Sequence, residues 1–304
     1  MSQAPRSVSP TEYNETVRRS YVFKQLRALG LVLLAFYGAL IIVLRSPLYE
    51  AVVLRPSPAD GTYERIGQML GIQEYLIPCR DGHQLNAWLF NPSGARTLVI
   101  VHHGNAGNIT NRIYLAKAIV ACGSAALLYD YRGYGKSSGE ASLAGLVDDG
   151  LAAYDFARSK LGFGASRIVN FGESIGTGVA CRVANMRPSA GLVLQSAIGS
   201  LPRVAQAGIA WLNVIPPPLF PSPHLDNVEE IKEVRVPILL FHGTADHLVP
   251  FQHSKLIFAN CRGPKKLVLF PQAGHNDMPA ETLEYRSELC RFLHNCTTPA
   301  DQLH

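Results

Sequence analysis

One serine in the sequence is flanked by glycines in the stretch GESIG, where Gly172 and Gly176 each lie two residues from Ser174. The run Arg167–Gly172 before it has the pattern of a strand, and the run after it, IGTGVACRVANM, has that of a helix. At a sharp strand-to-helix turn, a Cβ atom at either flanking position would collide with neighbouring backbone, and glycine removes that atom. The turn also holds the hydroxyl at a helix N-terminus, where developing negative charge is stabilised. The spacing therefore predicts a nucleophilic serine; the alternative is a serine N-cap in a glycine-rich turn.

A serine hydroxyl is almost fully protonated at neutral pH, so it needs a base, and the base needs a carboxylate to orient it. In turns of this type the chain order is serine, acid, histidine. Asp246 follows the strand-like run PILLF, and His275 follows the run KLVLF. Both residues are expected on loops at the carboxyl ends of strands, the edge of the sheet where Ser174 also lies. We predict a triad of Ser174, His275 and Asp246 that performs acyl transfer.

Other histidines and acids fit these roles less well. His242 ends a strand, and His247 adjoins the proposed acid, so neither is expected to be the base. Glu229 and Glu230 precede the strand and would lie at its opposite end. Asp277 shares a loop with the proposed base, so we expect it to support that loop or to lie at the surface.

Acyl transfer also needs hydrogen-bond donors for the oxyanion of the tetrahedral intermediate. The backbone N–H of Ile175, directly after the serine, is one candidate. The glycine-containing loop HHGNAGN follows the strand-like run TLVIV and offers a second. We select the N–H of Asn105 from this loop; the alternative is an ordinary strand-to-helix loop.

Strand-like and helix-like patterns alternate through most of the chain. The strand-like runs are Ile72–Pro78, Gln84–Phe90, Thr97–His103, Ala125–Asp130, Arg167–Gly172, Leu192–Ser196, Pro237–Gly243 and Lys266–Pro271. The first two alternate in polarity around a turn at Asp81-Gly82, which predicts an antiparallel hairpin. The later runs are almost continuously apolar, as is typical of strands buried on both faces. The fold class is therefore α/β: a mostly parallel eight-stranded sheet with helices on both faces.

The composition sets broad limits on the function. The chain has 304 residues, of which 47% are hydrophobic and 17% charged, with a formal net charge of +5. The basic residues are spread along the chain, so no nucleic-acid partner is expected. The six cysteines lack metal-binding spacing, so we expect neither a metal nor another cofactor. Cys122 and Cys181 are interpreted as buried thiols, and in an oxidising compartment a disulfide among Cys261, Cys290 and Cys296 is one alternative.

The N-terminal part contains an uncharged apolar run, Ala28–Leu44, between Arg27 and Arg45. Its length is at the lower limit for crossing a bilayer core of about 30 Å. Ser9 resembles an N-cap, so the helix is expected to begin before the apolar run. We predict a membrane anchor; a cleaved signal peptide and a buried core helix are the alternatives. Four Lys or Arg residues precede the run closely and two follow it, which favours a cytoplasmic N-terminus and a catalytic domain outside.

The predicted organisation has five parts. They are a cytoplasmic tail at 1–27, a transmembrane helix at 28–45, a linker at 46–71, a catalytic domain at 72–296 and a C-terminal tail at 297–304. The segment at about 198–233 carries apolar residues between two strand-like runs, and the family resemblance described next implies that it forms a short cap; closure of the core is the alternative. We take Trp211, Leu219 and Phe220 of the cap, together with Tyr134, as candidates for the substrate pocket.

Five motifs in order resemble those of the α/β-hydrolase superfamily: HHGNAGN, DYRGYGKSSG, GESIG, GTADHLVP and AGHND. The pattern is most similar to a membrane-anchored α/β-hydrolase-domain branch related to serine aminopeptidase and lysophospholipase-type hydrolases, and it covers about 72–293. The resemblance implies the same roles for the triad and for the N–H groups of Asn105 and Ile175. Relatives often carry a different residue where Glu173 stands.

The sequence thus predicts a membrane-anchored serine hydrolase of a carboxylic ester, with a small-molecule or lipid ester, including a lysophospholipid, as substrate. Peptidase, thioesterase and acyltransferase activities use the same triad and remain alternatives, because fold and triad do not fix the substrate. A non-catalytic, membrane-tethered binding module is the alternative from another class. The oligomeric state is not specified by the sequence.

Overall fold

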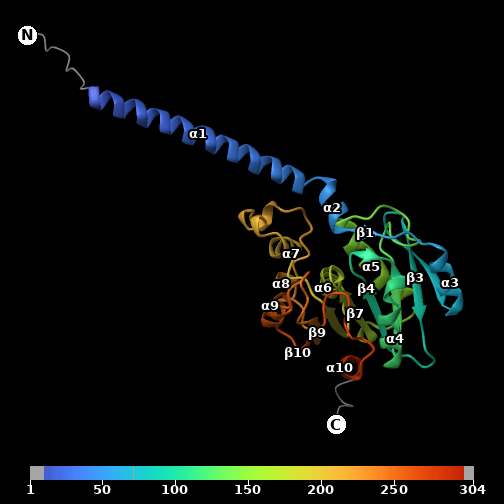
Figure 1. Cartoon of the computed structure of the whole chain (residues 1–304). Helices are drawn as coiled ribbons and strands as arrows, with labels where there is room; N and C mark the ends of the chain where they lie inside the picture. The colour runs from blue at the N-terminus through green and yellow to red at the C-terminus, as the bar shows by residue number, and fades with distance from the viewer. Residues whose placement is uncertain (1–9, 71, 298–304) are drawn as a thin grey trace, which may run out of the picture. The chain divides into compact units, whose positions relative to one another are not determined.

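The computed structural model describes residues 10–70 and 72–297. The chain divides into two compact units, Met1–Tyr49 and Glu50–His304, which are described separately (Figure 1).

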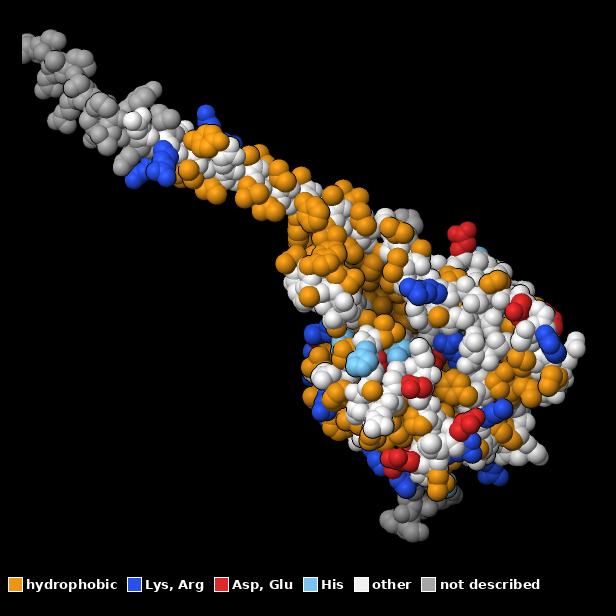
Figure 2. All heavy atoms as spheres, in the orientation of Figure 1, with side chains coloured by type: hydrophobic (Ala, Val, Ile, Leu, Met, Phe, Trp, Pro, Cys, Tyr) orange, Lys and Arg blue, Asp and Glu red, His pale blue; other side chains and the backbone are white. Residues whose placement is uncertain are grey.

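The first unit contains one long helix, α1 (Pro10–Leu44). Within α1, Arg18–Leu44 is long and apolar enough to cross a membrane, with a mean hydropathy of 2.3 over its most apolar window. Figure 2 shows hydrophobic side chains at the surface along this helix. Leu34 and Phe36 are among the exposed ones. The predicted span at 28–45 therefore belongs to a longer helix, whose proposed N-cap Ser9 lies outside the described residues.

The second unit is built on an eight-stranded sheet with the order β10-β9-β8-β7-β4-β6-β3-β2 (Figure 1). The strands are β2 (Gln73–Pro78), β3 (Gln84–Phe90), β4 (Leu98–His102), β6 (Ala125–Tyr129), β7 (Ile168–Glu173), β8 (Gly191–Gln195), β9 (Ile238–Gly243) and β10 (Lys265–Phe270). β3 pairs antiparallel with β2 and with β6, and all other neighbours in the sheet are parallel. The predicted sheet is confirmed, and each strand lies within about one residue of its predicted bounds, the usual precision limit for element ends.

Helices cover both faces of the sheet. On one face lie α4 (Ile113–Ala121) and α10 (Leu283–Thr297), which share a core with Val99 and Val101 of β4. On the other face lie α5 (Leu143–Ser159), α6 (Gly176–Met186) and α9 (Gln252–Asn260). The carboxyl ends of the parallel strands thus open between two helical layers.

The disulfide differs from the sequence-based alternative. Cys290 of α10 pairs with Cys122 at the end of α4, while Cys261 and Cys296 are free. The reason is that α4 and α10 pack against the same sheet face, which brings residues far apart in sequence together. Cys122 is therefore not a buried thiol, whereas Cys181 is one.

Of the segment predicted as a linker, the described residues 50–70 belong to the second unit. The segment forms α2 (Pro47–Val53), β1 (Arg55–Pro56) and α3 (Gly61–Met69). β1 pairs in parallel with β5 (Ala106–Gly107), in the loop that follows β4. Tyr63 of α3 is fully buried with its ring 4.6 Å from that of Trp88. The polar composition of this segment gave no indication that Tyr63 is buried and anchors it.

The predicted cap leaves the sheet after β8. It contains α7 (Leu201–Gly208), two 3-10 turns at Ala210–Val214 and Pro217–Leu219, and the short helix α8 (Asn227–Glu230). Its apolar side chains divide into two sets: Ile209, Trp211 and Val214 are exposed, whereas Leu212, Ile215 and Phe220 are buried.

A buried carboxylate links α3 to the loop after β4. Asp130 Oδ1 accepts a hydrogen bond from the Ile109 N–H at 2.8 Å, and its Oδ2 lies 3.0 Å from the Tyr63 hydroxyl. This hydroxyl also contacts Asn86 Oδ1, which must accept because the Asn86 amide nitrogen donates to Glu74. One hydroxyl proton cannot serve both acceptors, but a protonated Asp130 can donate to the Tyr63 oxygen. Burial raises the pKa of Asp130 to about 7, which fits this arrangement.

We therefore expect Asp130→Asn to remove a pH-dependent loss of stability. The folded-state pKa is raised above an unfolded value of about 4, so the contribution of Asp130 to stability is lost as pH rises from about 4 through 7. An asparagine amide N–H can donate to the Tyr63 oxygen in place of the carboxylic acid O–H, and it does so at all pH values. Relative to wild type, the variant should gain on the order of 2 kcal/mol between about pH 5 and pH 8, measured by urea unfolding. The exposed control Asp148→Asn should show no such trend, and a pH-independent difference for Asp130→Asn would contradict the protonated network.

Candidate active site

Ser174 lies on the sharp turn between β7 and α6. Its φ angle is +53°, a left-handed conformation that is uncommon for a residue other than glycine. The Ser174 N–H donates to the Gln195 carbonyl at 2.9 Å, and its carbonyl accepts from the Thr177 hydroxyl at 2.5 Å. These contacts hold the strained turn to β8 on one side and to the first turn of α6 on the other.

The structure explains both glycines of GESIG. A Cβ atom on Gly172 would lie 2.5 Å from Thr177 Cα, and one on Gly176 would lie 2.0 Å from the His102 carbonyl oxygen. Both neighbours are backbone atoms, which cannot move aside as a side chain can. The turn is therefore packed directly against the end of β4.

Three loops bring the predicted triad side chains together. His275 Nε2 lies 2.9 Å from Ser174 Oγ, and His275 Nδ1 lies 2.7 Å from Asp246 Oδ2. The serine follows β7, the acid follows β9 and the histidine follows β10, all at the carboxyl ends of parallel strands. Ser174 is 8% exposed and Asp246 4%, so the chain of hydrogen bonds lies largely out of water. This arrangement can carry a proton from the serine to the histidine.

Asp246 is fixed by four hydrogen bonds. Its Oδ1 accepts from the N–H groups of Leu248 and Val249 at 3.0 and 2.8 Å, and its Oδ2 faces His275 and, at 3.1 Å, His242 Nε2. Burial alone would raise the pKa of Asp246. The hydrogen bonds from the two histidines outweigh this effect and hold the pKa well below its usual range. The carboxylate therefore stays ionised at neutral pH.

His242 was not expected at this site, because it ends β9. Its Nε2 also lies 2.8 Å from the Val249 carbonyl, so this nitrogen faces two acceptors and must carry a proton. Its Nδ1 lies 2.6 Å from the Ser254 hydroxyl. A buried histidine four residues before the acid thus orients the carboxylate, and its position at the carboxyl end of a strand was the available signal.

The peptide between Gly104 and Asn105 carries the second predicted oxyanion donor. Its carbonyl accepts a hydrogen bond from His103 Nδ1 at 2.7 Å. The Asn105 N–H lies on the opposite side of this planar group and so points away from His103. Burial, more than the nearby Arg112 charge, lowers the pKa of His103 to about 3, so the ring is neutral at physiological pH.

Three hydrogen bonds with other segments fix the position of Asn105. Its carbonyl accepts from the Arg55 N–H at 2.9 Å and from the Tyr134 hydroxyl at 2.8 Å. Its side-chain amide donates to the Val53 carbonyl at 2.8 Å. The loop is therefore braced by the segment that precedes the predicted catalytic domain.

Two of the substrate-pocket candidates do not line an open pocket. Tyr134 is fully buried under the Asn105 loop, and Phe220 is buried inside the cap. Leu219 is half-buried, and only Trp211 is largely exposed, at 55%. The apolar pattern of the cap did not predict which of these side chains are buried and which are exposed, because both kinds look alike in sequence.

The remaining acids lie where the sequence placed them. Asp277 accepts from the Gly274 N–H at 2.6 Å and so shapes the His275 loop. Glu230 pairs with Arg182 at 2.9 Å, away from the triad. Across residues 10–70 and 72–297, no three His, Cys, Asp or Glu side chains are grouped to hold a metal ion.

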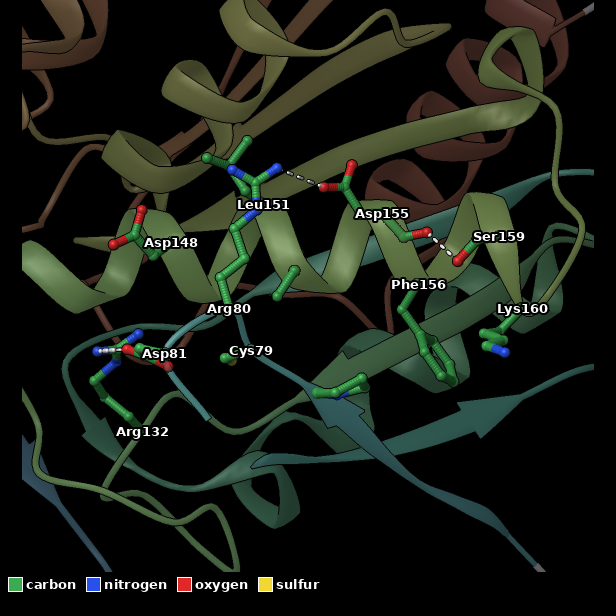
Figure 3. A pocket seen from close by; sticks show the side chains of 12 residues that line it. Cys79, Arg80, Asp81, Arg132, Asp148, Leu151, Asp155, Phe156, Ser159 and Lys160 are labelled. Atoms are coloured by element: carbon green, nitrogen blue, oxygen red, sulfur yellow. Dashed lines mark hydrogen bonds and ion pairs between the residues drawn. The ribbon is translucent and has the colours of Figure 1, made fainter. Parts of the chain in front are cut away.

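A groove of about 360 Å³ lies elsewhere, between the turn after β2 and helix α5 (Figure 3). Arg80 reaches Asp155 across it at 3.9 Å, and Asp81 pairs with Arg132 at 2.8 Å. None of the triad residues lines this groove, so it is not part of the candidate active site.

Known proteins share the fold and the sequence pattern. An esterase from Pyrococcus furiosus, Pf2001, superposes with a TM-score of 0.67 at 19% identity, over 80% of this chain and 98% of the esterase. The sequence profile described as "Serine aminopeptidase, S33" matches residues 93–231. A Mycobacterium tuberculosis protein, MT2364, is 36% identical over 207 residues, which make up 67% of this chain and 73% of the relative. The chain belongs to the α/β-hydrolase superfamily.

A further relative of this α/β-hydrolase is the Caenorhabditis elegans α/β-hydrolase domain-containing protein aho-3. It is 34% identical over 185 residues, which cover 59% of this chain and 52% of the nematode protein. Membership of the superfamily supports hydrolase chemistry, while the structural likeness to the esterase establishes the fold.

We expect Gly176→Ala to destabilise this α/β-hydrolase strongly. The added methyl group would overlap the backbone of His102 and His103, so the turn or the end of β4 must shift, at a cost of about 3 kcal/mol or more. Gly61→Ala is the matched control, because a Cβ there meets nothing within 4 Å and α3 favours alanine. Urea unfolding should show a large loss for the first variant and none for the control; equal stabilities would contradict the close packing of the turn.

Proposed function

We propose that this α/β-hydrolase is a membrane-anchored serine hydrolase that cleaves a carboxylic ester through an acyl-enzyme. The observation that carries the proposal is the continuous hydrogen-bonded chain from Ser174 Oγ through His275 to Asp246, with contacts of 2.9 and 2.7 Å. The match to the serine aminopeptidase profile supports it independently.

In the proposed mechanism, Ser174 Oγ attacks the ester carbonyl while its proton passes to His275 Nε2. Asp246 accepts the hydrogen bond from Nδ1 and stabilises the imidazolium. The N–H groups of Ile175 and Asn105 donate to the oxyanion of the tetrahedral intermediate. His275 then protonates the leaving alcohol, and a water molecule, deprotonated by the same nitrogen, releases the acid.

An ester with an apolar acyl chain is the substrate class that we propose. Its support is the apolar cap, where Ile209, Trp211 and Val214 are exposed, together with the apolar helix α1. A lipid or lysophospholipid ester has this chemistry. Peptidase, thioesterase and acyltransferase reactions need the same triad and are the competing outcomes of the substrate test, as is a binding module without turnover.

The proposed location has a cytoplasmic N-terminus and an extracytoplasmic catalytic domain. The excess of Lys and Arg before the apolar run supports this orientation. The Cys122–Cys290 disulfide supports it as well, because disulfides are rare in reducing compartments.

Replacement of the nucleophile tests the activity. Ser174→Ala should lower kcat for p-nitrophenyl esters by about 10⁴-fold or more and abolish fluorophosphonate labelling, while thermal unfolding stays near that of wild type. In wild type, kcat/KM should rise from acetate towards long acyl chains if an acyl chain is bound. Undiminished hydrolysis by the variant would remove Ser174 from the mechanism, and absent turnover of every ester with intact labelling would favour the other reactions.

Topology can be tested through the disulfide. In intact cells, the Cys122–Cys290 peptide pair should be protected from alkylation unless a reductant is added first, as read by mass spectrometry. Protease added to the non-cytoplasmic side of the sealed membrane should degrade the second unit but leave a tag at Met1 intact. Full alkylation of both cysteines without reductant, or a protected second unit, would contradict the proposed orientation.

A further inference from the structure

Glu173, the residue just before the proposed nucleophile, is buried and faces the Asn105 loop. Its Oε2 accepts a hydrogen bond from the Gly104 N–H at 3.1 Å, and its Oε1 accepts from the Tyr114 hydroxyl at 2.8 Å. The residue Glu173 as a whole is 8% exposed. A carboxylate in such a place requires a positive partner.

Arg112 is that partner, and it reaches the same loop. Its Nε donates to Glu173 Oε2 at 2.8 Å, and its Nη1 donates to the Ala106 carbonyl at 2.6 Å. Glu173 thus holds the N–H of Gly104, while Arg112 holds the carbonyl two residues later. Between these two contacts lies Asn105, whose N–H is the proposed oxyanion donor.

The fit around Gly104 leaves little room for movement. A Cβ on Gly104 would lie 3.0 Å from Arg112 Nη2, 3.4 Å from Glu173 Oε2 and 3.6 Å from Ser174 Cβ. The ion pair, the loop and the nucleophile therefore pack directly on one another. Burial would raise the pKa of Glu173, but the Arg112 charge and the hydrogen bonds to the carboxylate lower it below its usual value. The pair is therefore ionised at neutral pH.

The geometry points to a positioning role for the Arg112–Glu173 pair: it fixes the Asn105 loop against the Ser174 turn, so that the two oxyanion donors are held at the spacing the tetrahedral intermediate needs. This inference deepens the proposed function and rests on it. Neither side chain is assigned contact with the substrate.

The charges of the pair give a signature that a merely structural contact lacks. Loss of Arg112 alone leaves an uncompensated carboxylate beside the place where the oxyanion forms, and like charges repel there. Loss of both charges leaves a loosened but neutral site. Arg112→Gln should therefore lower kcat more than the double variant Arg112→Gln/Glu173→Gln does.

The experiment uses the full chain in detergent, with p-nitrophenyl acetate as substrate and kcat normalised to the fraction of sites labelled by a fluorophosphonate. Arg112→Gln should lower kcat about 100-fold and Glu173→Gln about 10-fold, with KM changed less than about 3-fold, because misplacing one oxyanion donor has effects of this size. The double variant should return to about the level of Glu173→Gln. Affinity for a trifluoromethyl ketone, whose adduct forms the same oxyanion, should fall in parallel with kcat/KM.

Arg187→Gln is the matched control, since Arg187 pairs with Asp155 at 2.8 Å from the far end of α6. It removes the same charge and should keep kcat within about 2-fold. If Arg112→Gln fails to fold, Arg112→Lys keeps the charge but has one donor group for two acceptors, and about a 10-fold loss of kcat is expected.

The proposed positioning role is overturned by any of three results. The Arg112 and Glu173 variants could keep kcat within about 2-fold of the control, their losses could fall on KM alone, or the double variant could be worse than Arg112→Gln. Ser174→Ala is run in parallel. Activity in Ser174→Ala would overturn the proposed function itself. If Ser174→Ala is inactive while the Arg112 and Glu173 variants are fully active, only the inference about the pair is overturned.

Discussion

The candidate active site depends on the backbone contact between the Ser174 turn and the end of β4. A Cβ on Gly176 would lie 2.0 Å from the His102 carbonyl oxygen, so the backbone of the turn packs directly against the end of the strand with no room for a side chain. Because β4 and β7 are parallel neighbours in register, His102 opposite Gly172, this contact is set by the sheet itself. The serine and the loop that follows β4 are consequently brought together by strand pairing before any side chain acts.

The sequence predicted the elements whose information is local. The strands were found because each is a short run with either alternating polarity or almost continuous apolar residues. The order serine, acid, histidine could be read because each residue lies in the segment after such a run. Parallel strands open their carboxyl ends on one edge, so the meeting of Ser174, Asp246 and His275 required no knowledge of side-chain packing.

What the sequence did not predict depends on contacts between distant segments. The Cys122–Cys290 pair follows from the packing of α4 beside α10, and the burial of Tyr134 follows from its hydrogen bond to the Asn105 carbonyl. The buried polar groups were missed for a related reason: Glu173 and His242 are polar residues at strand ends, where a surface position is the usual outcome. Only the three-dimensional partners show that these groups are satisfied inside the protein.

The segment around β1 extends the same argument to the N-terminal boundary of the fold. Val53 and Arg55 hold both the side chain and the carbonyl of Asn105, and Tyr63 connects α3 to Asp130, which in turn holds the Ile109 N–H. Both connections end on the loop that carries the proposed oxyanion donor. A catalytic domain that began at residue 72 would leave the Asn105 carbonyl without its Arg55 donor and the buried Asp130 without its Tyr63 partner. Loss of the Tyr63 partner alone would cost the buried Asp130 about 1–3 kcal/mol, so the structural unit has to include the chain that precedes residue 72.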